Sequence, residues 1–188
     1  VFASKFTDVF GILENGDSKV IRVEEIERDV NLFELIDGRM PEAENEALVL
    51  DGGMTKGTYG TGATLDLYLE SSDISEKLSC TSFTVVGVVK PPAYMAKTLG
   101  SGTLNNLDLE VVIFVPETVF LSDYYTTVYA TLDGAAGFNS FKTPYRQFVS
   151  QAADDLETFT NRQQEVLKDT LIAEYREKIA EGEDELEE

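Results

Sequence analysis

Residues 1–143 contain short apolar runs that are separated by glycine, proline and polar residues. The first clear pattern lies in residues 9–23, where two strand-like runs flank Asn15-Gly16. Asn and Gly readily adopt the positive φ angles that a two-residue β-turn requires. This stretch therefore predicts a β-hairpin.

Five further stretches have the composition of β-strands. Leu65, Leu67 and Leu69 occupy alternate positions, which predicts that their side chains share one face of a strand. The run FTVVGVV is almost wholly apolar, as is typical of a central strand that is buried on both faces. The predicted strands are residues 46–50, 63–70, 83–89, 111–115 and 124–132.

Two connecting segments also carry a prediction. Residues 24–36 fit neither a helical nor a strand period, so we expect either a short helix or a loop that leads into a strand. In the segment 38–46, Gly38 and Pro41 are predicted to fix a turn. Arg39 is the one basic residue of that segment, and it is a candidate for a structural ion pair.

The chain changes character after Pro144, because residues 145–181 contain neither glycine nor proline. Apolar residues recur there at intervals of three and four, which predicts one long amphipathic helix. At 1.5 Å per residue, 35–40 residues would extend roughly 50–60 Å, more than a single small core can cover. We therefore expect the helix to pair with another helix, although a helix that breaks and folds back over the sheet is an alternative. The apolar stripe comprises Phe148, Ala152, Leu156, Phe159, Val166, Leu167, Leu171, Tyr175 and Ile179.

These patterns predict an α+β fold. A mixed, mostly antiparallel sheet domain of residues 1–143 would precede a long, coiled-coil-like helical arm of residues 144–188. The predicted partner-binding residues of that arm are Leu156, Phe159, Leu167, Leu171 and Tyr175.

The net charge narrows the classes of partner. With 15 basic and 35 acidic residues, the chain carries a formal charge of −20. Nucleic acids and anionic lipid surfaces are therefore poor partners, whereas cations and cationic peptides remain open. The longest apolar runs are far shorter than the ~20 residues that cross a bilayer.

The composition also excludes most classes of catalytic site. The chain has no histidine and a single cysteine, which excludes histidine-based triads, imidazole zinc sites and thiolate clusters. The glycine-rich stretch 51–62 lacks the Walker A pattern. We predict no catalytic residue, no cofactor and no metal site. A carboxylate pair of a hydrolase, and weak calcium binding by residues 14–17 or 105–110, stay open as alternatives.

One loop is a candidate ligand site. Residues 91–109 are loop-like, and Tyr94, Met95 and Leu99 would be available to a ligand if they were exposed. Burial of these three side chains against the sheet is the alternative.

Several segments, read in order, resemble a known family. Residues 35–51, LIDGRMPEAENEALVLD, contain a Gly-Arg-x-Pro turn, a polar loop and a strand. Residues 83–95, FTVVGVVKPPAYM, contain an apolar strand that ends in proline, and VVIFVPETVF, YYTTVYATLDGA and YRQFV follow. In this order and spacing, residues 8–149 resemble the extracytoplasmic domain of bacterial ABC-transporter permeases of the FtsX-like or MacB-like family, most nearly the Firmicutes type with a coiled-coil insertion. Family members commonly have Gly-Asp where this chain has Gly62-Ala63.

The resemblance implies a non-catalytic domain outside the cell, between transmembrane helices of a parent permease. A separate cytoplasmic subunit would hydrolyse ATP. The domain would be attached to the membrane only through the parent's transmembrane helices. The helical arm would bind an extracellular protein or a second permease copy and transmit conformational change across the membrane. The alternative is an extracytoplasmic sensing domain that binds a peptide or another cationic ligand.

Overall fold

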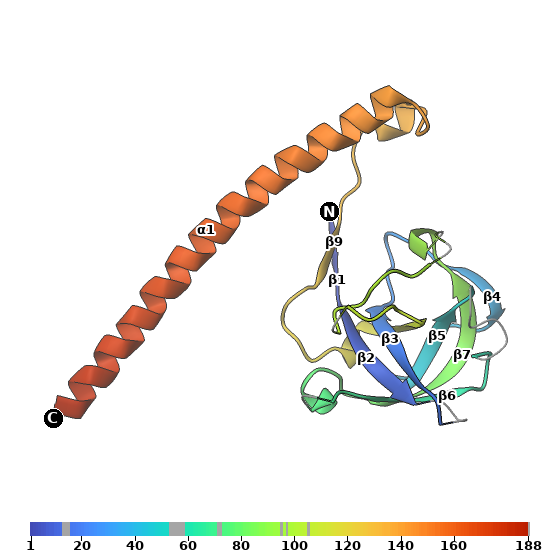
Figure 1. The fold of residues 1–188 in the computed structure, drawn as a ribbon, viewed down its shortest axis with the longest axis horizontal. Coiled ribbons are helices and arrows are strands. Elements are labelled where there is room, and N and C mark those ends of the chain that lie inside the picture. The colour runs from blue at the N-terminus through green and yellow to red at the C-terminus, as the bar shows by residue number, and fades with distance from the viewer. Residues whose placement is uncertain are drawn as a thin grey trace. The chain divides into compact units, whose positions relative to one another are not determined.

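The structure is a computed structural model that describes residues 1–12, 16–52, 59–70, 73–94, 96, 98–104 and 106–187. It divides the chain into two compact units, Val1–Ala130 and Thr131–Glu188. The first unit is a sheet domain and the second is dominated by one long helix, α1 (Thr143–Glu187), as Figure 1 shows. The predicted α+β fold is confirmed. The predicted division at residue 143 coincides with the start of α1, whereas the compact units divide twelve residues earlier.

Strands of the first unit form a mixed, barrel-like sheet (Figure 1). Its strands are β2 (Phe6–Ile12), β3 (Ser18–Glu25), β4 (Glu34–Gly38), β5 (Glu46–Leu50), β6 (Thr64–Tyr68), β7 (Ser82–Lys90) and β8 (Val111–Val115). Among the described residues they follow the order β4-β7-β5-β8-β3-β2-β6, and β6 also pairs with β7. This extra pairing closes the sheet on itself. The pairs β3–β8 and β5–β7 are parallel, and the other pairs are antiparallel.

Most of the predicted strands are present. The β2–β3 hairpin is confirmed, but the two-residue turn at Asn15-Gly16 is wrong, because Ile12 pairs with Ser18. Residues 13–15 of the connection lie outside the described residues. The predicted strand 124–132 is wrong in extent, because only β9 (Thr127–Tyr129) is a strand, and it pairs with β1 (Phe2–Ser4). Of the two alternatives for residues 24–36, the loop that leads into β4 is the observed one.

The strands β5, β7 and β8 are buried on both faces, which explains their nearly continuous apolar sequences. In β8, the side chains of Val111, Ile113 and Val115 belong to the inner core, which fills the barrel, whereas Val112 and Phe114 belong to an outer core. The outer core consists of Leu48, Leu50, Val86, Val89, Val112 and Phe114, with Ile26, Phe33, Tyr94 and Leu99 packed against it.

A β-bulge in β7 changes which face its residues present. Ala47 pairs with Val85 and Leu48 pairs with Gly87, so Val86 has no opposite residue in β5. As a result Val86 faces the outer core, whereas Val88, two residues further along, packs against the inner core. Alternation along FTVVGVV therefore fails at the bulge.

The long helix is continuous. Helix α1 runs for 45 residues without a break, so the alternative of a helix that folds back in two pieces is wrong. Pro144 follows the first helical residue, a position at which the helix does not need its missing N–H group. No helix among the described residues is long and apolar enough to span a membrane.

The close approach of β4 and β7 gives a testable prediction. Gly38 has a φ of +79°, and a Cβ there would lie 2.2 Å from the carbonyl oxygen of Val86. Gly100 has a φ of +80° but nothing within 4 Å of its Cβ position, so it is a matched control. Both alanine variants carry the ~1–2 kcal/mol cost of a left-handed residue. Gly38→Ala should lower the free energy of unfolding by a further ~1–3 kcal/mol, measured by urea denaturation. Equal losses in the two variants would contradict the close approach.

Candidate functional site

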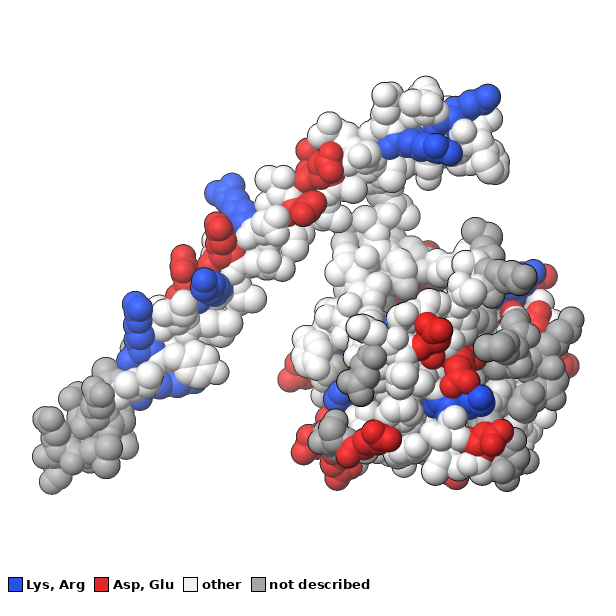
Figure 2. Space-filling model, in the orientation of Figure 1, with Lys and Arg blue, Asp and Glu red and all other residues white. Residues whose placement is uncertain are grey.

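The surface of α1 is the first candidate site. The five predicted partner-binding residues are exposed, from 43% for Leu171 to 63% for Tyr175. Large uncharged areas between the charged side chains of this helix are visible in Figure 2. Monomeric proteins rarely leave such a series of large apolar side chains in water, so this surface has the character of an interaction site. The exposed apolar side chains of α1 are Leu156, Phe159, Val166, Leu167, Leu171, Ile172, Tyr175 and Ile179.

Helical geometry places these residues on a broad, turning path. With 3.6 residues per turn, Leu156, Phe159 and Leu167 fall within an arc of roughly 80°. Leu171 and Tyr175 follow at steps of roughly 40° each, because a spacing of four residues overshoots one turn. The face of Leu156, Phe159 and Leu167 is therefore the compact part of the surface.

The start of α1 is held locally within the second unit. The ring of Phe138 packs on the ring of Phe148, with a distance of 5.1 Å between their centroids. Phe138 follows a short helical turn, Ala135–Gly137. This contact fixes the first turns of the helix, and it uses Phe148, the first large apolar residue of the predicted stripe.

Two of the three predicted ligand-loop residues are packed against the sheet. The ring of Tyr94 meets the ring of Phe114 edge to face at 6.2 Å, and Leu99 also packs on the outer core. The hydroxyl of Tyr94 donates a hydrogen bond to Glu24. Burial raises the pKa of Glu24 and, together with the charge of Glu24, that of Tyr94. The burial alternative thus describes Tyr94 and Leu99, while Met95 lies outside the described residues.

A buried ion pair inside the sheet domain was not predicted from the sequence. Asp8 on β2 is opposite Arg22 on β3, and Arg22 donates to both Asp8 oxygens at 2.7 and 3.0 Å. The backbone N–H of Thr103 donates to the same carboxylate at 2.6 Å. Burial acts to raise the pKa of Asp8, but the hydrogen bonds from Arg22 and Thr103 outweigh it, so the pKa is lowered. With every carboxylate oxygen occupied, this pair ties the loop at Thr103 to the barrel and has a structural role.

The predicted ion pair of Arg39 is confirmed. Its guanidinium donates to both carboxylate oxygens of Glu46, with a distance of 2.7 Å between Nη1 and Oε2. Glu46 also accepts hydrogen bonds from the backbone N–H groups of Glu42 and Ala43. These contacts, the one to Arg39 above all, lower the pKa of Glu46 to about 2. Arg39 therefore closes the loop between β4 and β5.

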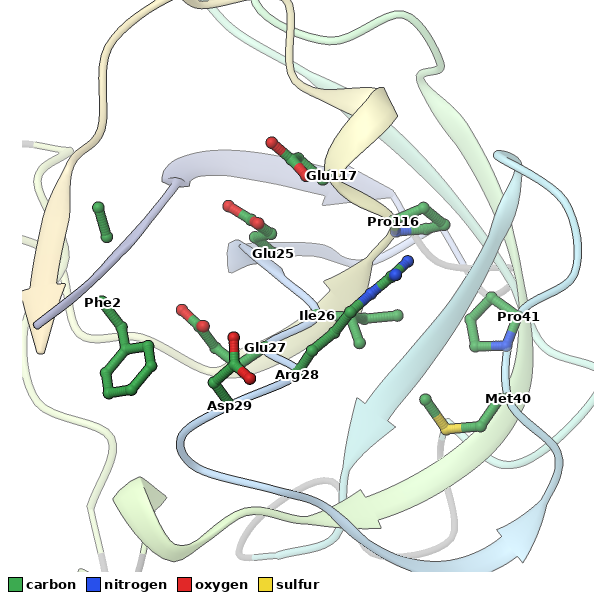
Figure 3. A pocket seen from close by; sticks show the side chains of 11 residues that line it. Phe2, Glu25, Ile26, Glu27, Arg28, Asp29, Met40, Pro41, Pro116 and Glu117 are labelled. Atoms are coloured by element: carbon green, nitrogen blue, oxygen red, sulfur yellow. The ribbon is translucent and has the colours of Figure 1, made fainter.

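An acidic cavity of about 500 Å³ lies beside this loop (Figure 3). Its residues come from four places in the sequence, namely β1, the end of β3 with the segment that follows it, the loop after β4 and the start of the turn after β8. Figure 3 shows the carboxylates on one side of the cavity and Met40 and Pro41 on the other. The lining residues are Phe2, Ala3, Glu25, Ile26, Glu27, Arg28, Asp29, Met40, Pro41, Pro116 and Glu117.

The carboxylates of this cavity repel one another. Burial raises the pKa of Glu25, and the negative charges of Glu117 and Glu27 raise it further. The Oε1 oxygen of Glu27 is buried and has no hydrogen-bond partner among the described residues. This site was not predicted from the sequence, because Glu117, Met40 and Pro41 meet the acidic segment that begins at Glu25 only when the barrel closes.

The described part of the chain contains no group of three acidic or cysteine residues that could hold a metal ion. Of the segments considered for calcium, Glu14, Asn15 and Asn105 lie outside that part of the chain. Glu110, at the end of the other segment, forms an ion pair with Lys19 at 2.7 Å.

No protein-family model matches this chain, and no curated protein or solved structure matches it at a significant level. The resemblance to ABC-transporter permeases therefore depends on the ordered sequence motifs alone.

The repulsion at Glu25 predicts a dependence of stability on pH. Because the folded state raises its pKa, the stabilisation linked to Glu25 is present below the unfolded-state pKa of about 4.3 and is lost as the pH rises through the folded-state value. Glu25→Gln, which keeps an acceptor for the N–H of Lys5, should raise the urea midpoint at about pH 7 and have no effect below about pH 4.

Asp66→Asn, at an exposed position on β6, measures the general effect of removing one negative charge. Equal gains in the two variants at neutral pH would show that no local repulsion acts on Glu25.

Proposed function

We propose that this chain is a non-catalytic interaction module that acts through α1, as the extracytoplasmic domain of an ABC-transporter permease. The observation that carries the proposal is a continuous helix of 45 residues whose large apolar side chains are exposed. The permease context is supported by the ordered motifs of residues 35–51 and 83–95 and those that follow them. The domain would lie on the outer face of the bacterial cell membrane.

The energetics favour a partner along α1. Moving one leucine or phenylalanine side chain from water into a packed interface contributes about 1.5–3 kcal/mol. Leu156, Phe159 and Leu167 are each about half exposed, at 49%, 59% and 59%. Covering these three side chains therefore contributes a substantial part of that free energy for each of them. A second helix is the natural partner, because knobs-into-holes packing buries a narrow apolar face along its length.

The two units differ in how completely their apolar side chains are buried. The barrel hides its inner core, where Ile21, Leu65 and Ile113 are fully buried. Helix α1 leaves its large apolar residues, from Leu156 to Ile179, in solvent over a length of roughly 35 Å. A closed barrel joined to a continuous helix is suited to carry a displacement, because neither element bends easily. In the proposed function, a separate cytoplasmic subunit hydrolyses ATP, and the domain relays the resulting movement to the partner of α1.

The sensing alternative receives less support at its predicted loop. Tyr94 and Leu99 pack against the outer core, so they do not form an open binding surface. A ligand at this loop would have to displace them from Phe114 and from the hydrogen bond to Glu24.

Sedimentation of the chain tests whether α1 is an association surface. We expect concentration-dependent dimers, and Leu167→Glu should reduce the dimer fraction strongly because a charge would enter the apolar interface. Thr158→Glu is the matched control, since position 158 lies nine residues away, on the opposite side of the helix. It adds the same charge and should leave the dimer fraction unchanged. A dimer fraction that does not respond to Leu167→Glu would exclude this face of α1 from the contact.

A further inference from the structure

The acidic cavity next to the Arg39 loop has the features of a binding site that is independent of α1. Its volume, about 500 Å³, falls within the range of ligand sites, roughly 300–1,000 Å³. All its lining residues belong to the sheet domain, so the cavity is complete without the second unit. The two kinds of side chain in it, carboxylates and apolar groups, define what it could bind.

The charge of the cavity is not neutralised from within. Four carboxylates line it, from Glu25, Glu27, Asp29 and Glu117, against the single guanidinium of Arg28. In Figure 3, Arg28 extends toward Pro116, away from the carboxylates of Glu27 and Asp29.

The neighbouring lysine, Lys5, offsets the charge of Glu25 only in part. Lys5 contributes its backbone N–H to Glu25, at 3.1 Å. Its ammonium group instead donates to the carbonyl oxygen of Ser122 at 2.8 Å and lies 5.5 Å from the ring centroid of Tyr125. Among the described residues, the ammonium group of Lys5 thus forms no ion pair with a carboxylate of the cavity.

A buried acceptor in the lining has no donor. Oε1 of Glu27 accepts no hydrogen bond from any described residue, although it is buried. Leaving a buried polar group unpaired costs about 1–3 kcal/mol, and more for a charged group. Since Glu27 as a whole is only partly buried and lines the cavity, a rotation of its side chain would bring this oxygen to a donor on a ligand. This observation is independent of the number of acidic residues.

The apolar side of the cavity indicates the shape of the ligand. Ile26, Met40, Pro41 and Pro116 line the cavity across from the carboxylates, and Met40 is 44% exposed (Figure 3). A metal ion would need several oxygens grouped at about 2.3–2.6 Å around one point. The described residues offer no such group. An organic cation on an aliphatic stem matches both sides, since lysine and arginine combine an apolar stem with a charged end.

We propose that this cavity binds a lysine or arginine side chain of a polypeptide partner, with the aliphatic stem against Met40 and Pro41 and the charged end among Glu25, Glu27 and Glu117. The cationic group supplies the donor that Glu27 lacks and relieves the repulsion between the carboxylates. The volume exceeds that of one side chain, so an apolar neighbour of the basic residue also enters. This site lies outside the helix surface of the proposed function.

The test uses the whole chain and two short peptides. The first peptide is acetyl-Ala-Lys-Leu-amide, and the second is the same peptide with its lysine Nζ acetylated. The methyl resonance of Met40, assigned with Met40→Leu, reports binding at the cavity in a titration followed by NMR. We expect the lysine peptide to shift this resonance saturably and the acetylated peptide to have no effect.

Charge-neutralising variants then locate the site. Glu27→Gln should weaken binding of the lysine peptide about tenfold, because a close charge pair is lost. Asp123→Asn removes the same charge from an exposed position outside the cavity and should change the affinity less than about twofold. Glu117→Gln, at an exposed position, is expected to weaken binding in the same direction as Glu27→Gln.

The proposal is overturned if the lysine peptide leaves the Met40 resonance unchanged or if the acetylated peptide binds equally well. Equal losses in Glu27→Gln and Asp123→Asn would show that the peptide follows the overall charge of −20 and not this cavity. The same Met40 shift with millimolar calcium alone would show a metal site. None of these outcomes involves α1, so the sedimentation result for Leu167→Glu stands separately.

Discussion

The structure depends on the way in which β7 is paired on both of its edges. One edge pairs with β5 along its length, while the other pairs first with β6, at Phe83, and then with β4, at Gly87. The bulge at Val86 allows this, because it adds a residue to β7 and turns the strand between its two neighbours. The β6 pairing closes the barrel around the inner core. The β4 pairing carries the Arg39 loop, which the ion pair with Glu46 then holds against β5.

The same arrangement creates the acidic cavity. Glu25 lies at the end of β3, Glu117 follows β8, and the parallel pairing of these strands places Glu25 opposite Val115. The loop after β4 supplies Met40 and Pro41. Glu117 therefore meets Glu25 and Glu27 at one end of the barrel, where burial and mutual repulsion keep the pKa of Glu25 raised. Such repulsion between carboxylates favours the binding of a cation in the cavity.

Sequence patterns predicted the fold well where local chemistry determines it. The alternation of Leu65 and Leu67, the apolar run of β8 and the unbroken helix after Pro144 each follow from a periodicity, and each is present. The structural role of Arg39 was also predictable, because the one basic residue of an acidic loop is attracted to the carboxylates around it. The family, the membrane context and the partner of α1 stay predictions.

Features that depend on the register of strand pairing could not be predicted from the sequence. A two-residue turn at Asn15-Gly16 would place Asp8 opposite Val23, whereas the observed register places it opposite Arg22 and so creates the buried ion pair. A shift of one residue exchanges the faces of a strand, and local patterns do not determine it. The bulge at Val86 was not predicted either, since every residue from Val85 to Val89 is valine or glycine and no polar residue marks a change of face. The cavity and the burial of Tyr94 depend on closure of the barrel, which involves residues far apart in the sequence.

The central claim is that α1 binds a partner and relays movement in the parent permease. Amide hydrogen exchange of residues 156–172 measures both, in the isolated chain and in the parent protein embedded in membranes with its ATPase subunit. We predict that exchange in the parent is slowed at least about tenfold, because a partner covers this part of α1, and that addition of ATP changes the protection. Exchange in the parent that is as fast as in the isolated chain and insensitive to ATP would contradict the account.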